Sequence, residues 1–188
     1  MIAILHEGSA KKTADNELLK LLIKELNLNL ELVEFFGMGG KDNFFKIDNT
    51  NYKLLLDKIR EETISKVFFV LDADYVKDNS KYGGYENSKK GIERVIKELG
   101  IENISDFYIV CNPETGEGYL ESFILSTIPK KHRQCIKNFL DCSNFKSKDN
   151  DKAILRSIYK VGYPNDPFNF SHPNFDELKS KLIKLFED

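Results

Sequence analysis

Acidic residues follow two of the most apolar runs in the chain. Residues 2–5 lead into Glu7, and residues 67–71 lead into Asp72 and Asp74. Unbroken apolar runs of this length favour strands that are buried on both faces, as in a parallel sheet. Open α/β sheets bind ligands at the carboxyl ends of their strands. If the two strands are neighbours, the three carboxylates meet at one edge of the sheet.

Carboxylates this close repel one another, and each is costly to ionise without a nearby cation. Mg²⁺ takes oxygen ligands and keeps positions open for water and for phosphate oxygens. The pattern therefore indicates a Mg²⁺ site suited to phosphoryl transfer or to phosphodiester hydrolysis. The other interpretation of Asp72 and Asp74 is an ordinary turn, because aspartate is common in turns.

Apolar runs of strand length alternate with helical patterns over residues 1–110. Strands are expected at residues 2–5, 30–36, 67–71 and 107–110, with helices around residues 18–26, 55–59 and 92–99. Gly100 follows the last of these helices as a stop signal. This order predicts right-handed crossovers and a sheet covered on both faces. The fold is thus expected to be α/β, with a mainly parallel, Rossmann-like sheet of four strands flanked by helices.

The remainder of the chain has helical patterns. They fall around residues 120–124, 136–140, 154–158 and 175–185. We therefore expect an α/β domain over residues 1–125 and a helical C-terminal extension, residues 126–188, packed on it.

Composition narrows the class of protein. The chain has 188 residues, of which 41% are hydrophobic, and a net charge of −2. Enough apolar surface is present for a real core, and a globally basic nucleic-acid-binding protein is excluded. A local basic face is still allowed. The tract Lys130-Lys131-His132-Arg133 either contacts a nucleic-acid backbone or forms a solvated helix face.

Cysteine spacing and hydropathy bear on the cellular compartment. Cys111, Cys135 and Cys142 form neither an even disulfide framework nor a zinc-binding pair, so reduced thiols are expected. No apolar run approaches the roughly 18 residues of a membrane span. We expect a cytoplasmic protein that does not enter the membrane. The oligomeric state is open, a homodimer included.

The acidic pattern resembles the Toprim domain. That family has a glutamate at the end of its first strand, usually followed by glycine, and a later Asp-x-Asp; Glu7-Gly8 and Asp72-Ala73-Asp74 match these motifs. The likeness covers roughly residues 1–125 and is greatest to small stand-alone proteins related to the overcoming-lysogenization-defect nucleases. Gly39-Gly40-Lys41-Asp42-Asn43 also looks like a segment of small Toprim-like proteins. The resemblance implies a Toprim-like version of the expected sheet.

The resemblance also implies roles for particular residues. Glu7 would be a metal ligand or general acid/base, with Gly8 in the same turn, and Asp72 and Asp74 would hold Mg²⁺, for which Mn²⁺ substitutes. Asp15 and Glu121 match acids that bind a second metal in nucleases of the family. The chain is too short for the tyrosine domain of Toprim topoisomerases or the extra modules of primases. Nucleic acid or a nucleotide is the implied partner.

Each of these residues has a simpler interpretation. Asp15 is also suited to cap the first helix, and Glu121 to lie on a helix surface. Lys41 either contacts a phosphate and balances the acids or is a solvated residue of a glycine turn. His6 is expected to point away from Glu7 and to be buried and hydrogen-bonded rather than to bind metal.

These observations leave more than one function open. The first hypothesis is a Mg²⁺-dependent nuclease or nucleotidyl transferase, with Lys41 joining Glu7, Asp72 and Asp74 in catalysis. The second is a non-catalytic Toprim-like module that binds a nucleotide, nucleic acid or protein. A phosphatase of the haloacid-dehalogenase type ranks last, because those enzymes place Asp-x-Asp on the first strand of the fold. The sequence leaves open whether the chain is an enzyme.

Overall fold

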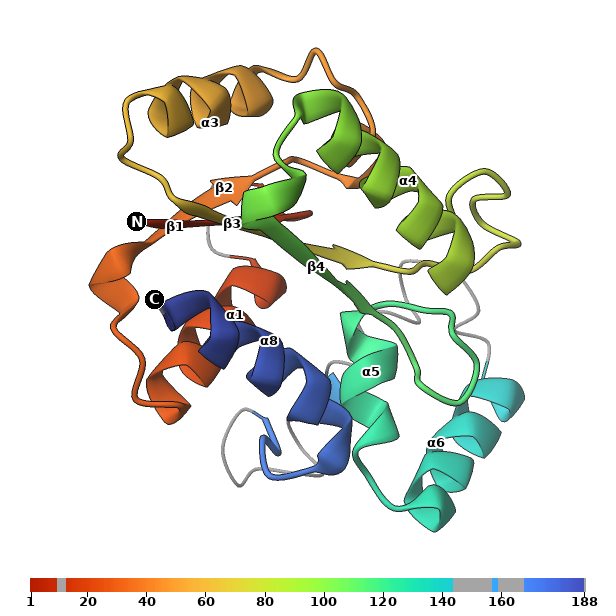
Figure 1. Cartoon of the computed structure of the whole chain (residues 1–188). Helices are drawn as coiled ribbons and strands as arrows, with labels where there is room; N and C mark the ends of the chain where they lie inside the picture. Colours follow the sequence, from red (N-terminus) through yellow and green to blue (C-terminus); the bar gives the residue numbers. More distant parts are fainter. Residues whose placement is uncertain (10–12, 144–156, 159–167, 188) are drawn as a thin grey trace.

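A four-stranded, entirely parallel sheet forms the centre of the protein, in the order β2-β1-β3-β4. The computed structural model describes residues 1–9, 13–143, 157–158 and 168–187. The strands are β1 (Ile2–His6), β2 (Val33–Gly37), β3 (Lys66–Asp72) and β4 (Ser105–Val110). The prediction of an α/β, Rossmann-like fold with helices on both faces is confirmed (Figure 1).

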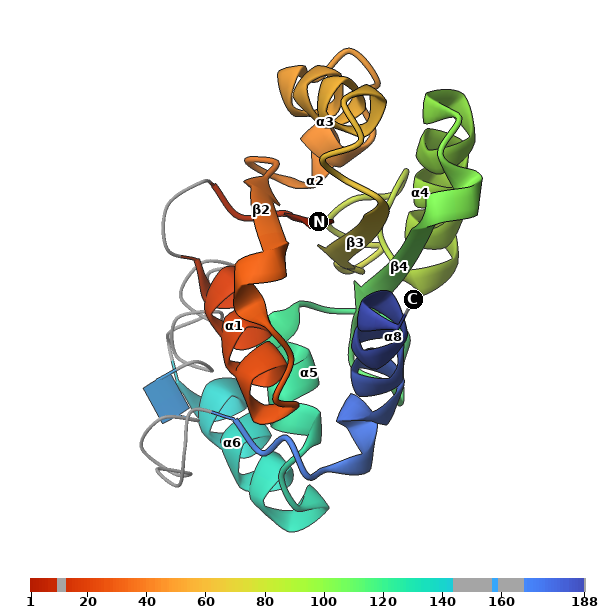
Figure 2. The same cartoon turned by 60° about the vertical axis from the view of Figure 1, so that its left-hand side comes forward.

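The crossover helices lie on opposite faces because the chain changes direction across the sheet. The connections are α1 (Ala14–Glu25) from β1 to β2, α3 (Thr50–Arg60) from β2 to β3, and α4 (Tyr85–Leu99) from β3 to β4. Right-handed crossovers that run in opposite directions place their helices on opposite faces. Figure 2 shows α3 and α4 on one side and α1 on the other. The strand order therefore reverses between β1 and β3, which makes this pair the switch point of the sheet.

Alternate residues of the strands enter two separate cores. Ile2 and Ile4 pack with α1, whereas Ala3 and Leu5 pack with α3 and α4. Both sets are almost completely buried. This explains why the strands are unbroken apolar runs rather than alternating ones.

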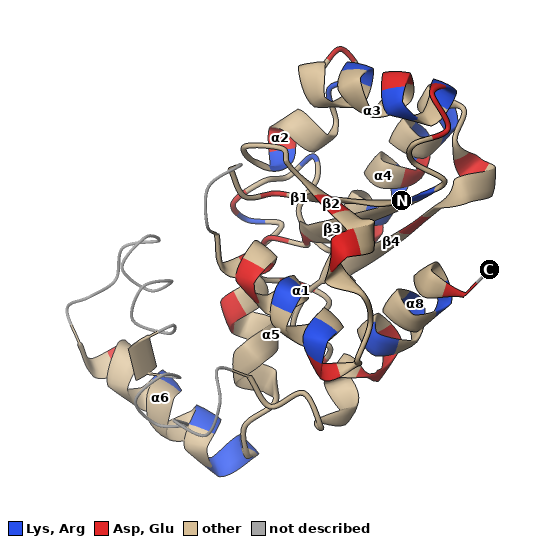
Figure 3. Ribbon diagram, turned by 90° about the vertical axis from the view of Figure 1, so that its left-hand side faces the viewer, with Lys and Arg blue, Asp and Glu red and all other residues tan. Residues whose placement is uncertain are grey.

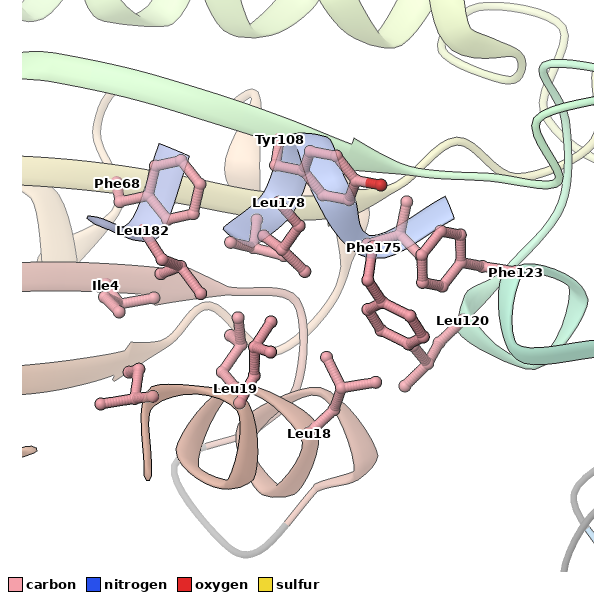
Figure 4. Packing of buried hydrophobic residues seen from close by; sticks show 14 of the residues in the cluster. Ile4, Leu18, Leu19, Phe68, Tyr108, Leu120, Phe123, Phe175, Leu178 and Leu182 are labelled. Carbon is pink, nitrogen blue, oxygen red and sulfur yellow. The ribbon is translucent and has the colours of Figure 1, made fainter. Parts of the chain in front are cut away.

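The C-terminal part completes the core on the α1 side. It contains α5 (Leu120–Ser126), α6 (Lys130–Cys142), a 3₁₀ turn (Pro173–Phe175) and α8 (Asp176–Phe186). Leu178 and Leu182 of α8 pack against Phe68 and Tyr108 of the sheet (Figure 4). By contrast, α6 buries none of its residues. The helix predicted at residues 154–158 lies outside the described residues, except for the helical residues 157–158.

Two local differences separate the structure from the sequence prediction. The strand predicted at residues 30–36 begins only at Val33, because Leu30–Leu32 form a 3₁₀ turn in which the Asn29 side chain accepts the amide proton of Glu31. A short helix, α2 (Lys41–Phe44), follows β2 and was not predicted. Every helix in the described part of the chain is too short or too polar to cross a bilayer.

Candidate functional site

Glu7 and Asp72 lie at the carboxyl ends of the two strands that form the switch point. Glu7 follows β1 directly, and Asp72 is the last residue of β3, its hydrogen-bonded neighbour. The Oε1 atom of Glu7 accepts a hydrogen bond from the backbone amide of Asp72 at 3.1 Å. The two predicted site residues are therefore in direct contact. Asp72 is itself buried.

The loop after β2 brings Lys41 into the same place. Gly39 and Gly40 adopt positive φ angles of 74° and 126°, which favour glycine. Their amides donate hydrogen bonds to the carbonyls of Gly8 (3.1 Å) and Glu7 (2.7 Å). These bonds fasten the loop after β2 to the loop after β1. Lys41, the next residue, is consequently directed inward and is only 7% exposed.

The Lys41 ammonium group holds the turn that contains the paired aspartates. Its Nζ atom donates hydrogen bonds to the carbonyl oxygens of Asp72 at 2.7 Å and of Ala73 at 2.5 Å. It also lies 3.4 Å from Oδ2 of Asp74. The interpretation of Lys41 as a solvated turn residue is wrong. The residue balances the acidic cluster and shapes its backbone.

Asp74 has a left-handed backbone, with φ of 58°. Aspartate tolerates this conformation better than most residues. The conformation is fixed by a bridge to the segment after β4: the amide of Asp74 donates to the carbonyl of Gly118 at 2.9 Å, and the amide of Gly118 donates back at 3.1 Å. Gly118 was not predicted as a site residue. Its glycine-rich surroundings, Gly116-Glu117-Gly118, were the available signal of a tight turn.

The electrostatics of the site favour a protonated Glu7. Burial, followed by the negative charge of Asp74, raises the pKa of Glu7 to about 8, although Lys41 acts in the opposite direction. The charge of Asp15 raises this pKa further, whereas the hydrogen bond from the Asp72 amide lowers it. Burial lowers the pKa of Lys41, and its acidic neighbours offset part of that effect. Negative charge at Glu7 is thus incompletely compensated by the protein alone.

The site has the donor atoms that Mg²⁺ prefers, but they are not gathered for one ion. Within residues 1–9, 13–143, 157–158 and 168–187, no group of three or more His, Cys, Asp and Glu side chains is arranged to hold a metal. The carboxylates of Glu7, Asp72 and Asp74 fit the chemistry of a hard cation. Their shared negative charge fits it as well. Binding through all of them would require side chains to change rotamer.

The structure also shows where the two other predicted acids, Asp15 and Glu121, lie. Asp15 lies in the first turn of α1, but Thr13 is the residue that caps this helix, its Oγ1 accepting from the amide of Asn16 at 3.5 Å. The alternative of Asp15 as the helix cap is therefore wrong. Glu121 lies in the first turn of α5 and is 6% exposed, so it is not a surface residue.

The two residues next to Glu7 in the sequence, His6 and Gly8, have structural explanations. His6 is completely buried, with its Nε2 atom 3.3 Å from Nδ2 of Asn16, as predicted for a histidine that faces the helix layer. A side chain at Gly8 would collide with Thr13, because an added Cβ atom would lie 2.3 Å from its Oγ1 atom. Close approach of the turn after β1 to the N-cap residue of α1 therefore accounts for this glycine.

Comparison with models of protein families, with curated proteins and with solved structures finds no match to this chain.

Proposed function

We propose that this chain catalyses Mg²⁺-dependent cleavage of a phosphodiester bond in nucleic acid, or the closely related transfer of a nucleotidyl group. The observation that carries the proposal is the convergence of Glu7, Lys41 and Asp74 at the switch point between β1 and β3. Ligands of open α/β sheets bind at such points. The resemblance of the acidic motifs to the Toprim domain agrees with this chemistry.

Asp72 and Asp74 would hold the metal ion, with Glu7 either as a further ligand or as the general acid/base, and Asp15 and Glu121 are the candidates for a second ion. When bound, Mg²⁺ polarises a phosphate group and lowers the pKa of a coordinated water. The three cysteines are free thiols, so we place this activity in the cytoplasm.

The chain's own groups supply proton transfer and positioning. A carboxyl group with a pKa of about 8 holds its proton at neutral pH and releases it to a nearby base. General acids and bases work best when their pKa lies near the operating pH, so Glu7 is suited to move the proton of the attacking water or of the leaving oxygen. Lys41 is occupied by the carbonyls of Asp72 and Ala73. It is therefore a positioning residue for the paired aspartates.

The test is a cleavage assay on labelled single-stranded and double-stranded DNA and RNA, with Mg²⁺, with Mn²⁺ and with EDTA. We expect metal-dependent cleavage that Glu7→Gln, Asp72→Asn and Asp74→Asn each reduce at least 100-fold, whereas circular dichroism shows folded proteins. Glu61→Gln, which removes one exposed acid at the end of α3, is the matched control and should cleave normally.

Two results would contradict the proposal. Cleavage that survives unchanged in all three acidic variants would show that the activity lies elsewhere. Binding of Mn²⁺ or nucleotide in calorimetry, with no turnover of any substrate, would identify the chain as the non-catalytic binding module.

A further inference from the structure

Two pockets flank the segment that follows Asp74, and their charges are opposite. The larger one, of about 720 Å³, lies beside β4 and the start of α4 and is lined by Glu86, Glu117 and Glu177, without a lysine or arginine among its described lining residues. The smaller one, of about 200 Å³, is lined by Arg133 and Lys137, without an acidic residue among those described. Only the smaller pocket suits an anion.

The smaller pocket adjoins the acidic site. Tyr75, the residue directly after Asp74, forms one of its walls, and its hydroxyl group lies 3.2 Å from Oγ of Ser122 in α5. The opposite wall is α6, which contributes Ile136 as well as the two cations. Figure 3 shows α6 apart from the sheet layers, with its Lys and Arg positions in blue. We call this space the α5–α6 pocket.

Arg133 has hydrogen-bonding capacity left over. One terminal nitrogen donates to Oε1 of Glu114 at 2.9 Å. The Nε atom is buried and has no hydrogen-bond partner among the described residues. A buried donor without an acceptor is unfavourable, so a ligand that brings an acceptor oxygen gains by binding here once the arginine side chain turns to present its Nε atom. Arginine matches the oxygens of a phosphate group especially well.

We propose that the α5–α6 pocket binds one unpaired nucleotide of the substrate strand, beside the phosphodiester that the acidic site attacks. This inference rests on the proposed function and adds the class of substrate, a single strand. The pocket, of about 200 Å³, is smaller than the roughly 300–1,000 Å³ of sites that enclose whole small molecules, so it would enclose the base and leave the sugar and phosphate at its mouth. Apolar side chains from Leu125 and Ile136 suit the faces of a base, and Arg133 and Lys137 suit its phosphate. Bases in a duplex are stacked and paired, so only an unpaired nucleotide can enter.

The test measures binding without turnover. Fluorescence anisotropy in EDTA compares labelled 12-mers of single-stranded DNA and RNA with the corresponding blunt duplex over a series of salt concentrations. We expect the wild-type protein to prefer a single strand. The double variant Arg133→Gln/Lys137→Gln should bind at least 10-fold more weakly, and its plot of log affinity against log salt should be shallower by about 0.7, as expected for the loss of one neutralised phosphate.

A matched control removes one lysine and one arginine charge from a different helix. Lys53 and Arg60 lie on α3, across the sheet from α6, and Arg60 is also paired with a carboxylate at 2.9 Å, that of Asp57. The variant Lys53→Gln/Arg60→Gln should keep the wild-type affinity and salt dependence. If it weakens binding as much as Arg133→Gln/Lys137→Gln does, only net charge matters and the proposal is overturned.

A second variant separates a pocket from a merely basic surface. Ile136→Lys adds a positive charge to α6 but fills the α5–α6 pocket with a longer, charged side chain. An occupied pocket predicts weaker binding of single strands than in the wild type, whereas simple electrostatic attraction predicts tighter binding. Tighter binding by Ile136→Lys, or a wild-type preference for the duplex, would overturn the proposal.

Failure of this inference can be distinguished from failure of the proposed function. Metal-dependent cleavage that requires Glu7 and Asp74, together with unchanged binding by Arg133→Gln/Lys137→Gln, would reject the pocket and keep the nuclease. Pocket-dependent binding of single strands without any cleavage would support the pocket and reject catalysis.

Discussion

The Nζ atom of Lys41 lies 3.4 Å from Oδ2 of Asp74, and the two residues follow different strands: Lys41 begins α2 after β2, and Asp74 lies in the loop after β3. The lysine side chain is 5% exposed and the aspartate side chain 20% exposed, so this is a largely buried ion pair. Lys41 also donates hydrogen bonds to the carbonyls of Asp72 and Ala73. One side chain thus joins the loops after β2 and β3 and offsets the charge of the acidic site.

Removal of this ammonium group should destabilise the protein. Lys41→Met takes one donor from each of the carbonyls of Asp72 and Ala73 and the counter-ion from Asp74, although the Ala73 carbonyl still accepts from the amide of Gly84 at 2.9 Å. Loss of one member of a buried pair costs about 3 kcal/mol, and partial exposure of Asp74 places this case near or below that figure. Urea denaturation measures the change in the free energy of unfolding. Lys53→Met, on an exposed position of α3, is the control and should change it by less than about 0.5 kcal/mol. Equal effects of the two variants would contradict the structural role of Lys41.

The second prediction concerns the pH dependence that Glu7 imposes. Its pKa is about 8 in the folded protein and near 4.5 in the unfolded chain, so the folded state binds the proton more tightly. Without divalent cations, the contribution of Glu7 to stability is therefore favourable at low pH and is lost as pH rises from about 4.5 to about 8. Glu7→Gln mimics the protonated form at every pH. Relative to wild type, this variant should gain roughly 3–4 kcal/mol between pH 5 and pH 8 in EDTA.

The comparison between the two proteins isolates this effect. Other titrating groups act in both proteins and cancel in the difference between their unfolding free energies. A constant difference from pH 5 to pH 8 would show that Glu7 has an ordinary pKa. Added Mg²⁺ should reduce the pH-dependent difference, because a cation favours the ionised carboxylate of the wild type.

The fold was largely predictable because its determinants are local. Strands buried on both faces require unbroken apolar runs, and the helices carry one apolar stripe each, so both types of pattern are visible in the sequence. The error at Leu30 arose because an apolar segment formed a 3₁₀ turn next to Asn29, whose side chain competes for a backbone amide. Such competition is decided by a single hydrogen bond.

The candidate site was predictable only in part. The placement of Glu7 and Asp72 follows from the rule that parallel strands end at one edge of the sheet. Burial of Lys41 does not, because it depends on hydrogen bonds between the loops after β1 and β2, and lysine is rarely buried. The left-handed turn at Asp74 depends on Gly118, 44 residues later in the chain (118 − 74). Contacts over such separations leave no periodic pattern.

The third prediction is a loss of stability in mild acid caused by His6. Burial, with a smaller contribution from Lys20, lowers the pKa of His6 to about 4, whereas an unfolded histidine titrates near 6.5. The unfolded state therefore binds the proton first, so the stabilising contribution of neutral His6 is complete above pH 6.5 and is lost as pH falls toward 4. The contribution of His6 to the free energy of unfolding should drop by about 2–3 kcal/mol over this range, opposite in sign to the contribution of Glu7.

The variant His6→Gln removes the titrating group, so the unfolding free energy of the wild type minus that of His6→Gln should fall by this amount between pH 6.5 and pH 4. His132→Gln, which replaces an exposed histidine on α6, should keep the wild-type profile. A difference between the wild type and His6→Gln that stays constant from pH 6.5 to pH 4 would assign the acid sensitivity to other groups.

The last prediction tests why position 8 is glycine. A Cβ atom at Gly8 would lie 2.3–2.6 Å from the Oγ1, Cγ2 and Cβ atoms of Thr13. Gly8→Ala should therefore destabilise the protein by about 1–3 kcal/mol, as expected for overpacking. Because the carbonyl of Gly8 accepts the amide proton of Gly39, the shift should also disturb the loop that carries Lys41.

A compensating change makes this explanation testable. Thr13→Gly removes all three clashing atoms, and glycine replaces threonine as a helix cap at a loss of only a few tenths of a kcal/mol. The double variant Gly8→Ala/Thr13→Gly should thus be more stable than Gly8→Ala alone, with a coupling energy of about 1 kcal/mol in urea denaturation. Strictly additive losses would mean that the alanine methyl group is accommodated without contact with Thr13. The glycine would then be required for another reason, such as close approach of a ligand to the turn after β1.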